Sequence, residues 1–168
     1  MSAASAGRRP RAHAAPAPER TVYLHPGKIY AAAGPATVTT ILGSCVAVCL
    51  FDVQAGVGGI NHYLLPHWAG GADASARYGN VALQALLERV VSLGSRPGGL
   101  QAKVFGGACV LEAFRGDGGG HLGQRNADLA SAFLRERGIP LAASDTGGHR
   151  GRKLVFRTDD GTALVRVL

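Results

Sequence analysis

The sequence predicts an α+β protein with two main helices and a large sheet system that is mixed or mostly antiparallel. Short runs of β-branched and apolar residues recur along the chain, and turns rich in glycine or proline separate them, which is typical of strands. Apolar residues recur at three- and four-residue spacing in only two stretches, the pattern of surface helices. The length of 168 residues is sufficient for one domain with a sizeable core.

The first half of the chain predicts five strands. Residues 21–24 and 28–32 flank a His-Pro-Gly turn, and residues 36–42 form a β-branched run. Residues 46–51 are continuously apolar, which indicates a strand buried on both faces. Residues 57–65 follow after a short turn, so we expect the last two runs to pair as a hairpin.

The second half predicts the two helices and the remaining strands. Helices are expected from about residue 80 to 93 and from about 125 to 137, and a glycine follows each of them. A glycine-rich loop is expected at 115–120. The remaining strand predictions are residues 102–105, 139–143, 154–157 and 163–167, and the last two should form a hairpin.

The first twenty residues differ from the rest in composition. Residues 1–20 contain four arginines among alanines and prolines and lack the apolar segment of a signal peptide. They predict a disordered basic tail, followed by a single domain at 21–168. The net charge of +7 includes this tail, and no basic run with interleaved aromatics follows, so nucleic acid is not expected as a partner. No apolar run approaches the roughly eighteen residues of a membrane span, so membrane insertion is not expected.

The three cysteines indicate a reducing compartment, the cytoplasm, because their number is odd and no secretion signal precedes them. Cys45 and Cys49 would lie about 13 Å apart on a strand, too far for a disulfide or a shared metal. Cys109 has no neighbouring pair at ligand spacing, so no metal or other cofactor is expected. Cys49, within VAVCLF, is expected to be a buried apolar residue.

Cys45 is the candidate nucleophile. It follows Gly43 and Ser44 in a tight turn before a strand, where a side chain can project into a cleft. Backbone N–H groups in such a turn can also point at a developing oxyanion. The alternative interpretation is a buried structural thiol, because a reactive thiol needs a lowered pKa that spacing does not establish.

His62 is the candidate base, because in an antiparallel hairpin the start of one strand lies opposite the far end of its partner. A cysteine–histidine pair is the minimum for a cysteine hydrolase, and a third group commonly orients the imidazole. Thr39 and Thr40 lie on the preceding strand, where alternation directs only one of them towards the site, and spacing does not choose between them. A buried core histidine is the alternative interpretation of His62. Three histidines in predicted loops are alternative partners for Cys45: His67, His121 and His149.

Five motifs then occur in a collinear order: LGSCVAVCLFD, GGINHYLLP, KVFGGA, LGQRNA and DTGGHRGRK. From about residue 21 to its end the chain resembles the CheD family of chemoreceptor glutamine deamidases. The resemblance implies a layered α/β/β sandwich similar to the catalytic domain of toxin-type cysteine deamidases. It implies that Cys45 is the nucleophile, that His62 is the general base and acid, and that Thr39, six residues before Cys45, orients His62. Ser44 and Gly43 are assigned to the oxyanion loop.

The implied activity is that of a protein-glutamine glutaminase, which converts receptor glutamine side chains to glutamate in bacterial chemotaxis, with receptor methylesterase activity as a side reaction. The implied partners are methyl-accepting chemotaxis receptors and a CheC-type phosphatase. The alternative is a non-catalytic adaptor that binds the same two partners.

Overall fold

The structure is a computed structural model that describes residues 19–110 and 120–168. These residues form nine strands, two α-helices and one short 3₁₀ turn, η1 (Pro97–Gly99). The helices are α1 (Gly79–Ser92) and α2 (Leu122–Glu136). The strands are β1 (Arg20–Tyr23), β2 (Lys28–Ala33), β3 (Ala36–Leu42), β4 (Val46–Asp52), β5 (Val57–His62), β6 (Gln101–Gly106), β7 (Leu141–Thr146), β8 (Arg152–Arg157) and β9 (Ala163–Val167).

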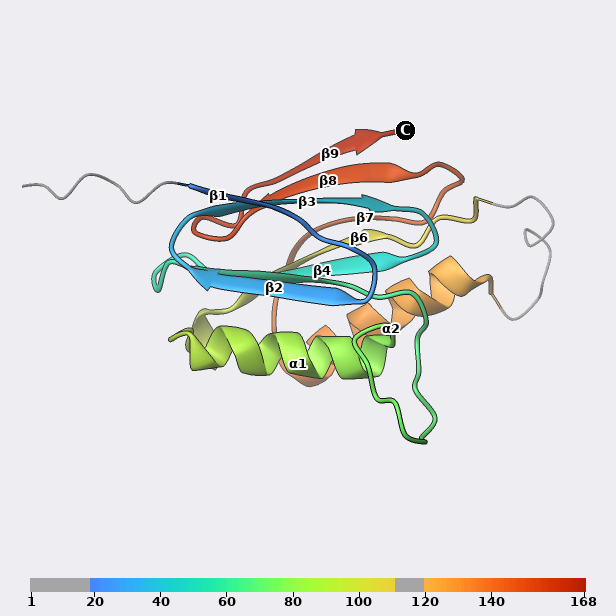
Figure 1. The fold of residues 1–168 in the computed structure, drawn as a ribbon, viewed down its shortest axis with the longest axis horizontal. Coiled ribbons are helices and arrows are strands. Elements are labelled where there is room, and N and C mark those ends of the chain that lie inside the picture. The colour runs from blue at the N-terminus through green and yellow to red at the C-terminus, as the bar shows by residue number, and fades with distance from the viewer. Residues whose placement is uncertain (1–18, 111–119) are drawn as a thin grey trace, which may run out of the picture.

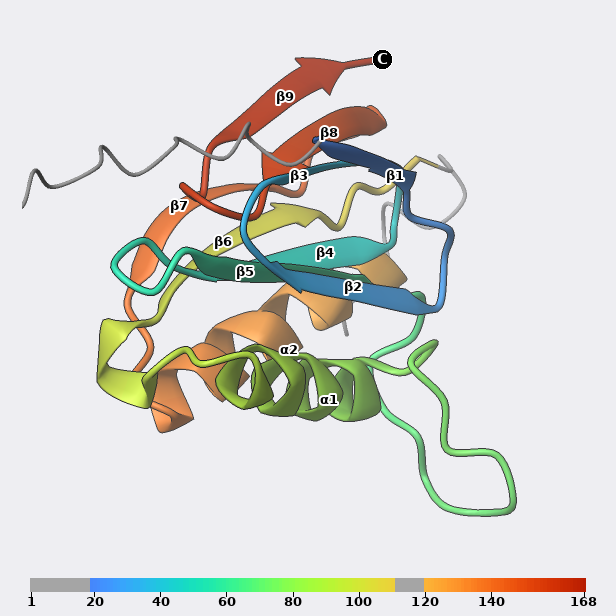
Figure 2. The same ribbon diagram turned by 60° about the vertical axis from the view of Figure 1, so that its left-hand side comes forward.

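The elements stack in three layers, as Figure 1 shows. A five-stranded sheet of order β2-β5-β4-β6-β7 lies in the middle, and a four-stranded sheet of order β1-β3-β8-β9 covers one of its faces. Both α-helices cover the other face, which is also visible after rotation in Figure 2. The predicted α+β sandwich with two main helices is therefore confirmed, whereas its likeness to toxin-type deamidases stays a prediction.

Both sheets are mixed. The β4–β5 and β8–β9 pairs are antiparallel, as predicted for the two hairpins. The β1–β3 and β6–β7 pairs are parallel. The outer strands thus supply the parallel component, and antiparallel pairing dominates elsewhere.

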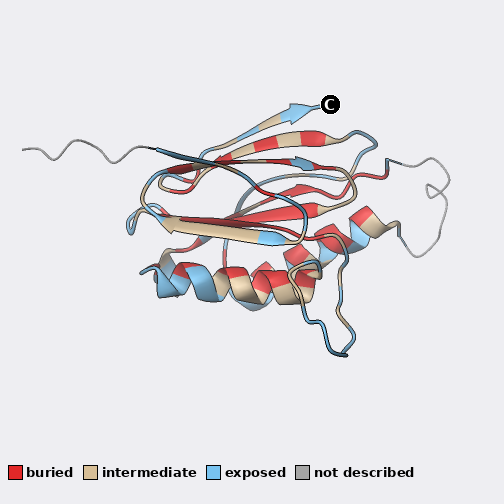
Figure 3. Ribbon diagram, viewed as in Figure 1, coloured by how far each residue is buried: buried red, intermediate tan, exposed pale blue. Residues whose placement is uncertain are grey.

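β4 runs between two apolar cores, and all seven of its residues are buried (Figure 3). Val46, Val48 and Leu50 point towards the helices. Ala47, Cys49 and Phe51 point towards the four-stranded sheet. The strand is buried on both faces because it is the central strand of the middle layer, as its continuous apolar run predicts. Cys49 is a fully buried apolar residue, which is also confirmed.

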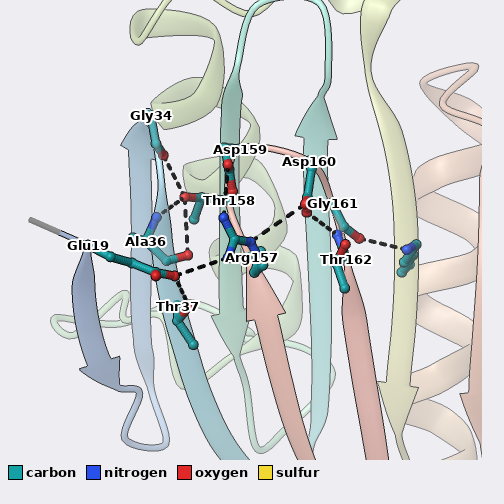
Figure 4. Close-up of polar contacts among 11 residues, drawn as sticks. Glu19, Gly34, Ala36, Thr37, Arg157, Thr158, Asp159, Asp160, Gly161 and Thr162 are labelled. Carbon is teal, nitrogen blue, oxygen red and sulfur yellow. Dashed lines mark hydrogen bonds and ion pairs between the residues drawn. The ribbon is translucent and has the colours of Figure 1, made fainter. Parts of the chain in front are cut away.

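The described chain begins inside the predicted tail. Arg20 opens β1 opposite Ala36, and the Glu19 carboxylate accepts a hydrogen bond from the Thr37 hydroxyl and pairs with Arg157 at 3.3 Å (Figure 4). β1 therefore begins one residue before the strand predicted at residues 21–24, whereas the division into a tail at 1–20 and one domain at 21–168 stays a prediction. The rest of the tail, residues 1–18, and residues 115–119 of the predicted glycine-rich loop lie outside the described residues.

Two other boundaries differ for local reasons. α2 begins at Leu122, earlier than predicted, because the His121 side chain accepts a hydrogen bond from the Gln124 N–H at 3.2 Å and caps the helix. β5 ends at His62 instead of residue 65, and beyond it only an isolated bridge joins Val46 to Tyr63. Neither α-helix has the length and apolar character needed to cross a bilayer, and this holds for the described residues.

Candidate active site

The turn that carries Cys45 crosses from one sheet to the other, because it joins β3 to β4. Three successive carbonyl oxygens of this turn accept hydrogen bonds: Gly43 from Ala108 N at 2.9 Å, Ser44 from Asn126 Nδ2 at 3.0 Å and Cys45 from Gly107 N at 2.8 Å. In a trans peptide the N–H points opposite to the carbonyl of the preceding residue. The N–H groups of Ser44 and Cys45 therefore point away from Ala108 and Asn126.

Glycines let the end of β6 wrap around this turn. Gly106 and Gly107 have φ values of 106° and 67°, in the region that favours glycine. A Cβ added to Gly106 would collide with the carbonyl oxygen of Cys45, and one added to Gly107 would lie 2.7 Å from the carbonyl oxygen of Gly123. The KVFGGA motif thus has a structural reason, because its two glycines bring the backbone close to the cysteine turn.

Strand register brings Cys45 and His62 to one face. Val46 and Tyr63 form a bridge with reciprocal hydrogen bonds of 3.1 and 3.0 Å between their backbone groups. This register sets His62 opposite Ala47, so Cys45 occupies the diagonal position across the two strands. Such diagonal neighbours are about 7–8 Å apart between Cα atoms, within reach of longer side chains.

The side chains of Cys45 and His62 also point to the same face of the middle sheet. Ala47 and Ile60 belong to the core between the sheets, and side chains alternate along strands, so Cys45 and His62 both face the four-stranded sheet. No hydrogen bond joins the two in this structure, because His62 Nε2 is buried without a partner among the described residues.

The hydroxyl that contacts His62 belongs to Thr40. Its Oγ1 lies 2.8 Å from His62 Nδ1 and 2.8 Å from the carbonyl oxygen of Leu24. The buried residues of β3 alternate, and Thr40 is among those that face the middle sheet. Thr39 is only partly buried and lies on the opposite face of β3. The assignment of Thr39 as the residue that orients His62 is therefore wrong in this structure. The Thr39 side chain lies on the face of β3 that points away from His62, and Thr40 makes the contact instead.

The hydrogen bonds of Thr40 determine which nitrogen of His62 carries the proton. A hydroxyl has one hydrogen, and the Leu24 carbonyl can only accept, so the Thr40 hydroxyl donates to Leu24. Thr40 Oγ1 is then the acceptor in its contact with His62, and Nδ1–H is the donor. This leaves the lone pair on Nε2, the nitrogen without a partner.

Burial keeps both Cys45 and His62 uncharged. Burial lowers the pKa of His62 to about 4, and the nearby Leu24 carbonyl offsets this only in part. Burial also raises the pKa of Cys45 above its ordinary value, although the Cys45 N–H lowers it somewhat. At neutral pH the site therefore holds a thiol and a neutral imidazole instead of a thiolate–imidazolium pair.

Asn126 is a site residue that sequence reasoning did not identify. It is fully buried on α2, and its Nδ2 donates to the carbonyl oxygens of Ser44 at 3.0 Å and Leu64 at 2.9 Å. Asn126 lies in the LGQRNA motif, but in the sequence that motif indicates only the family and assigns no role to this residue. A signal was present, because Asn126 is a polar residue four positions before Ala130 on the apolar face of α2.

The alternative partners of Cys45 are occupied elsewhere or exposed. His121 caps α2, and His67 and His149 are exposed. Of the predicted site residues, Gly43, Ser44 and Cys45 thus form one turn, and His62 lies on β5 at the diagonal position from Cys45.

Comparison with known proteins gives a consistent result. The family model for CheD chemotactic sensory transduction matches residues 64–167. A protein of Anaeromyxobacter dehalogenans named as probable chemoreceptor glutamine deamidase CheD 1 is 54% identical over 147 residues, which are 88% of this chain and 84% of that protein. A probable chemoreceptor glutamine deamidase CheD of Trichlorobacter lovleyi is 43% identical over 148 residues, 88% of this chain and 91% of that one. One of Rhodospirillum rubrum is 46% identical over 146 residues, with coverage of 87% and 81%.

The match to the family model begins after Cys45 and His62, so it does not test their roles. The overall match is nevertheless extensive, and it agrees with the family that the five motifs indicate. The chain belongs to the CheD family.

Proposed function

We propose that this chain is a cysteine-dependent protein-glutamine deamidase that converts glutamine side chains of chemotaxis receptors to glutamate. The observation that carries the proposal is the state of His62. Thr40 holds its Nδ1, and its buried Nε2 is free to accept a proton on the face that it shares with Cys45. The names of the relatives supply the substrate class.

Acylation is the first half of the proposed reaction. His62 Nε2 takes the proton from the Cys45 thiol, and the sulfur attacks the carboxamide carbon of the substrate. A carbon–sulfur bond forms and the carbonyl oxygen becomes an oxyanion. His62 then returns the proton to the amide nitrogen, the carbon–nitrogen bond breaks, and ammonia leaves behind a thioester.

Deacylation uses the same groups. His62 Nε2 takes a proton from water, and the resulting hydroxide attacks the thioester carbon. The carbon–sulfur bond breaks, the sulfur recovers its proton from His62, and glutamate is released. Atoms balance over the two halves, since one water enters and one ammonia leaves.

The cysteine turn supports the stabilisation of the oxyanion. The carbonyl groups of Gly43 and Ser44 are bound by Ala108 and Asn126, so the N–H groups of Ser44 and Cys45 point away from those two partners. The Cys45 N–H lowers the pKa of its own thiol, and in the tetrahedral intermediate the oxyanion is bonded to the same carbon as that sulfur. We assign the Cys45 N–H as the main donor and the Gly43-Ser44 segment as the loop that presents it.

We assign Thr40 as the residue that orients the imidazole. A hydroxyl is a weaker partner than a carboxylate because it adds no negative charge to stabilise the imidazolium. This agrees with the low pKa of His62, about 4, which makes the resting imidazole neutral.

The proposed setting is the cytoplasm, where the helices of methyl-accepting receptors present their glutamines. Methyl esters of receptor glutamates are a second proposed substrate, because the same nucleophile can attack an ester carbonyl. A CheC-type phosphatase is the second proposed partner.

The test is a mass measurement on a receptor cytoplasmic fragment incubated with the protein. Each converted glutamine should gain about 1 Da, since an amide becomes an acid. Cys45→Ala should abolish the gain, whereas the matched Cys49→Ala variant, which removes a buried thiol from β4, the strand that follows Cys45, should retain it. A receptor that stays unchanged, or one that changes equally with Cys45→Ala, contradicts the proposal. A receptor that binds without changing would instead support the adaptor alternative.

A further inference from the structure

We propose that Asn126 is a positioning residue that holds the Cys45 turn in register with the strand of His62. The inference rests on the proposed function, because it concerns the same two groups, and it adds a third that acts through them. Asn126 lies on α2, outside both strands, and its side chain is fully buried.

The two hydrogen bonds of the Asn126 side chain, which we call the clamp, lie where β4 and β5 separate. The β4–β5 pairing ends with the bridge between Val46 and Tyr63. Beyond that bridge, Asn126 Nδ2 connects the two backbone segments by donating to Ser44 O at 3.0 Å and to Leu64 O at 2.9 Å. A side-chain amide thus replaces the next step of the ladder, directly beside Cys45.

The chemistry of the contact requires an amide. Both partners are carbonyl oxygens, so one atom must donate two hydrogen bonds, and a carboxamide nitrogen has two N–H groups. An ionised carboxylate of the same shape has no hydrogen to donate, and a hydroxyl has only one. Asparagine is therefore the neutral side chain of this size that satisfies both Ser44 and Leu64.

α2 is held at the distance that this contact needs. The Tyr63 hydroxyl donates to the main-chain oxygen of Asn126 at 2.6 Å. One turn earlier, a Cβ added to Gly123 would collide with the carbonyl oxygen of Gly107, whose N–H donates to Cys45 O at 2.8 Å. The helix, the glycine bend and the cysteine turn are thus packed backbone to backbone, and Asn126 connects them to the His62 strand.

The consequence for the reaction is specific. Cys45 and His62 occupy diagonal positions on either side of the Val46–Tyr63 bridge. Proton transfer from Cys45 to His62 therefore depends on how far the two backbone segments separate there. Without the clamp the turn can move relative to His62 while the rest of the sandwich stays packed. The reactivity of Cys45 should therefore fall more than the folded fraction does.

The experiment compares Asn126→Ala and Asn126→Asp with wild type by alkylation of Cys45 with iodoacetamide, resolved by peptide mapping and measured from pH 5 to 9. Thr158→Val is the matched control, because Thr158 is equally buried and bridges Ala36 N and Gly34 O at 2.9 and 2.8 Å. Circular dichroism sets a temperature at which every variant is folded. We expect the neutral-pH rate to fall at least tenfold for both Asn126 variants and less than twofold for Thr158→Val.

In receptor deamidation the same variants should lower kcat with little change in KM, because Asn126 is buried and does not contact substrate. Folded Asn126 variants that alkylate at the wild-type rate overturn the proposal. If they do not fold, Tyr63→Phe decides, since it loosens the main chain of Asn126 without altering its amide. A two- to fivefold slower rate for Tyr63→Phe supports the proposal, and an unchanged rate overturns it.

Failure of this inference is distinguishable from failure of the proposed function. A wild-type protein that deamidates nothing, together with slower alkylation in the Asn126 variants, removes the function and leaves the clamp. Wild-type deamidation with unchanged alkylation and turnover in the Asn126 variants removes the clamp and leaves the function.

Discussion

The two ends of the sandwich treat ionisable groups in opposite ways. At the end where β8 finishes, Arg157 lies among Glu19, Asp159 and Asp160 (Figure 4). There the hydrogen bond and the charge of Asp159 raise the pKa of Arg157. The backbone N–H of Thr162 is the main cause that lowers the pKa of Asp160.

At the other end, where β3 gives way to β4, the shifts favour neutral forms. Burial raises the pKa of Cys45 and lowers that of His62 to about 4. A charged group at this end, Arg152, lies on β8 opposite Leu42 of β3, and its buried guanidinium is paired with the Asp145 carboxylate at 2.8 Å. The same strands therefore hold a cluster of charges in solvent at one end, whereas at the other end the Cys45 thiol and the His62 imidazole are uncharged and the buried Arg152 guanidinium is paired with a carboxylate. A thiol at this end must therefore become a thiolate during the reaction, by losing its proton to a base beside it.

The largest expected contrast is between His62→Ala and Thr158→Val. Loss of the proposed general base should lower receptor deamidation roughly 10²–10⁴-fold. Thr158→Val changes an equally buried polar group at the charged end and should leave the rate within about twofold. Rates from the mass assay, corrected for folded fraction, check both, and equal losses in the two variants would contradict the separation of the ends.

The second contrast concerns stability in acid. The folded pKa of His62 is about 4, below its ordinary value of 6.5, so the unfolded state binds more protons between these pH values. Stability should therefore fall as pH drops from about 6.5 to 4, by up to about 3 kcal/mol. Asp52 and Asp160 have pKa values below 3.8, so the stability that they add is lost only at lower pH.

Urea unfolding at several pH values measures this slope. His62→Ala should have a correspondingly flatter profile across the same pH range. An identical slope in wild type and His62→Ala would show that His62 does not change its protonation on unfolding.

Neighbouring threonines provide the third contrast. Thr40→Val keeps the shape of the side chain but removes the hydrogen bonds to His62 Nδ1 and Leu24 O, which should cost about 1–3 kcal/mol of stability and lower kcat about tenfold. Thr39→Val changes the outer face of the same strand and should alter kcat less than twofold. Parallel kinetics of the two variants measure the difference, and a larger effect for Thr39→Val would restore the family-based assignment.

These threonines also show how far the sequence could lead. Alternation predicts that only one of them faces the site, but the choice needs the position of the middle sheet, which no local pattern encodes. Counting six residues back from Cys45 by family resemblance selected the outer face. The apolar run of β4 and the Cys45–His62 hairpin were predictable, because both depend on strand periodicity and a short turn.

Asn126 could not be predicted as a partner of the site for a related reason. Its contacts join a helix to the turn before β4 and to the segment after β5, both more than sixty residues earlier. Local propensity carries no information on such pairs. The glycines of the KVFGGA motif were visible, but their purpose depends on the approach of Cys45 and Gly123.

The smallest effect is expected at the charged end. Arg157→Gln should shift the melting temperature by no more than about 2 °C, because ion pairs in solvent contribute little, and added salt should reduce even that shift. Deamidation should not change. Thermal melts at low and high salt check this, and a large loss of activity would connect the two ends in a way that the contacts do not support.

At rest, Cys45 and His62 are both neutral, and the His62 proton is on Nδ1. Nitrogen-15 NMR of the histidine rings at pH 7, with His62→Ala to assign the signals, tests it most directly. The predicted result is a neutral His62 ring protonated at Nδ1, which gains its second proton only near pH 4. A His62 ring doubly protonated at pH 7, or a neutral ring protonated at Nε2, would show that His62 does not rest as a neutral base with its lone pair on Nε2.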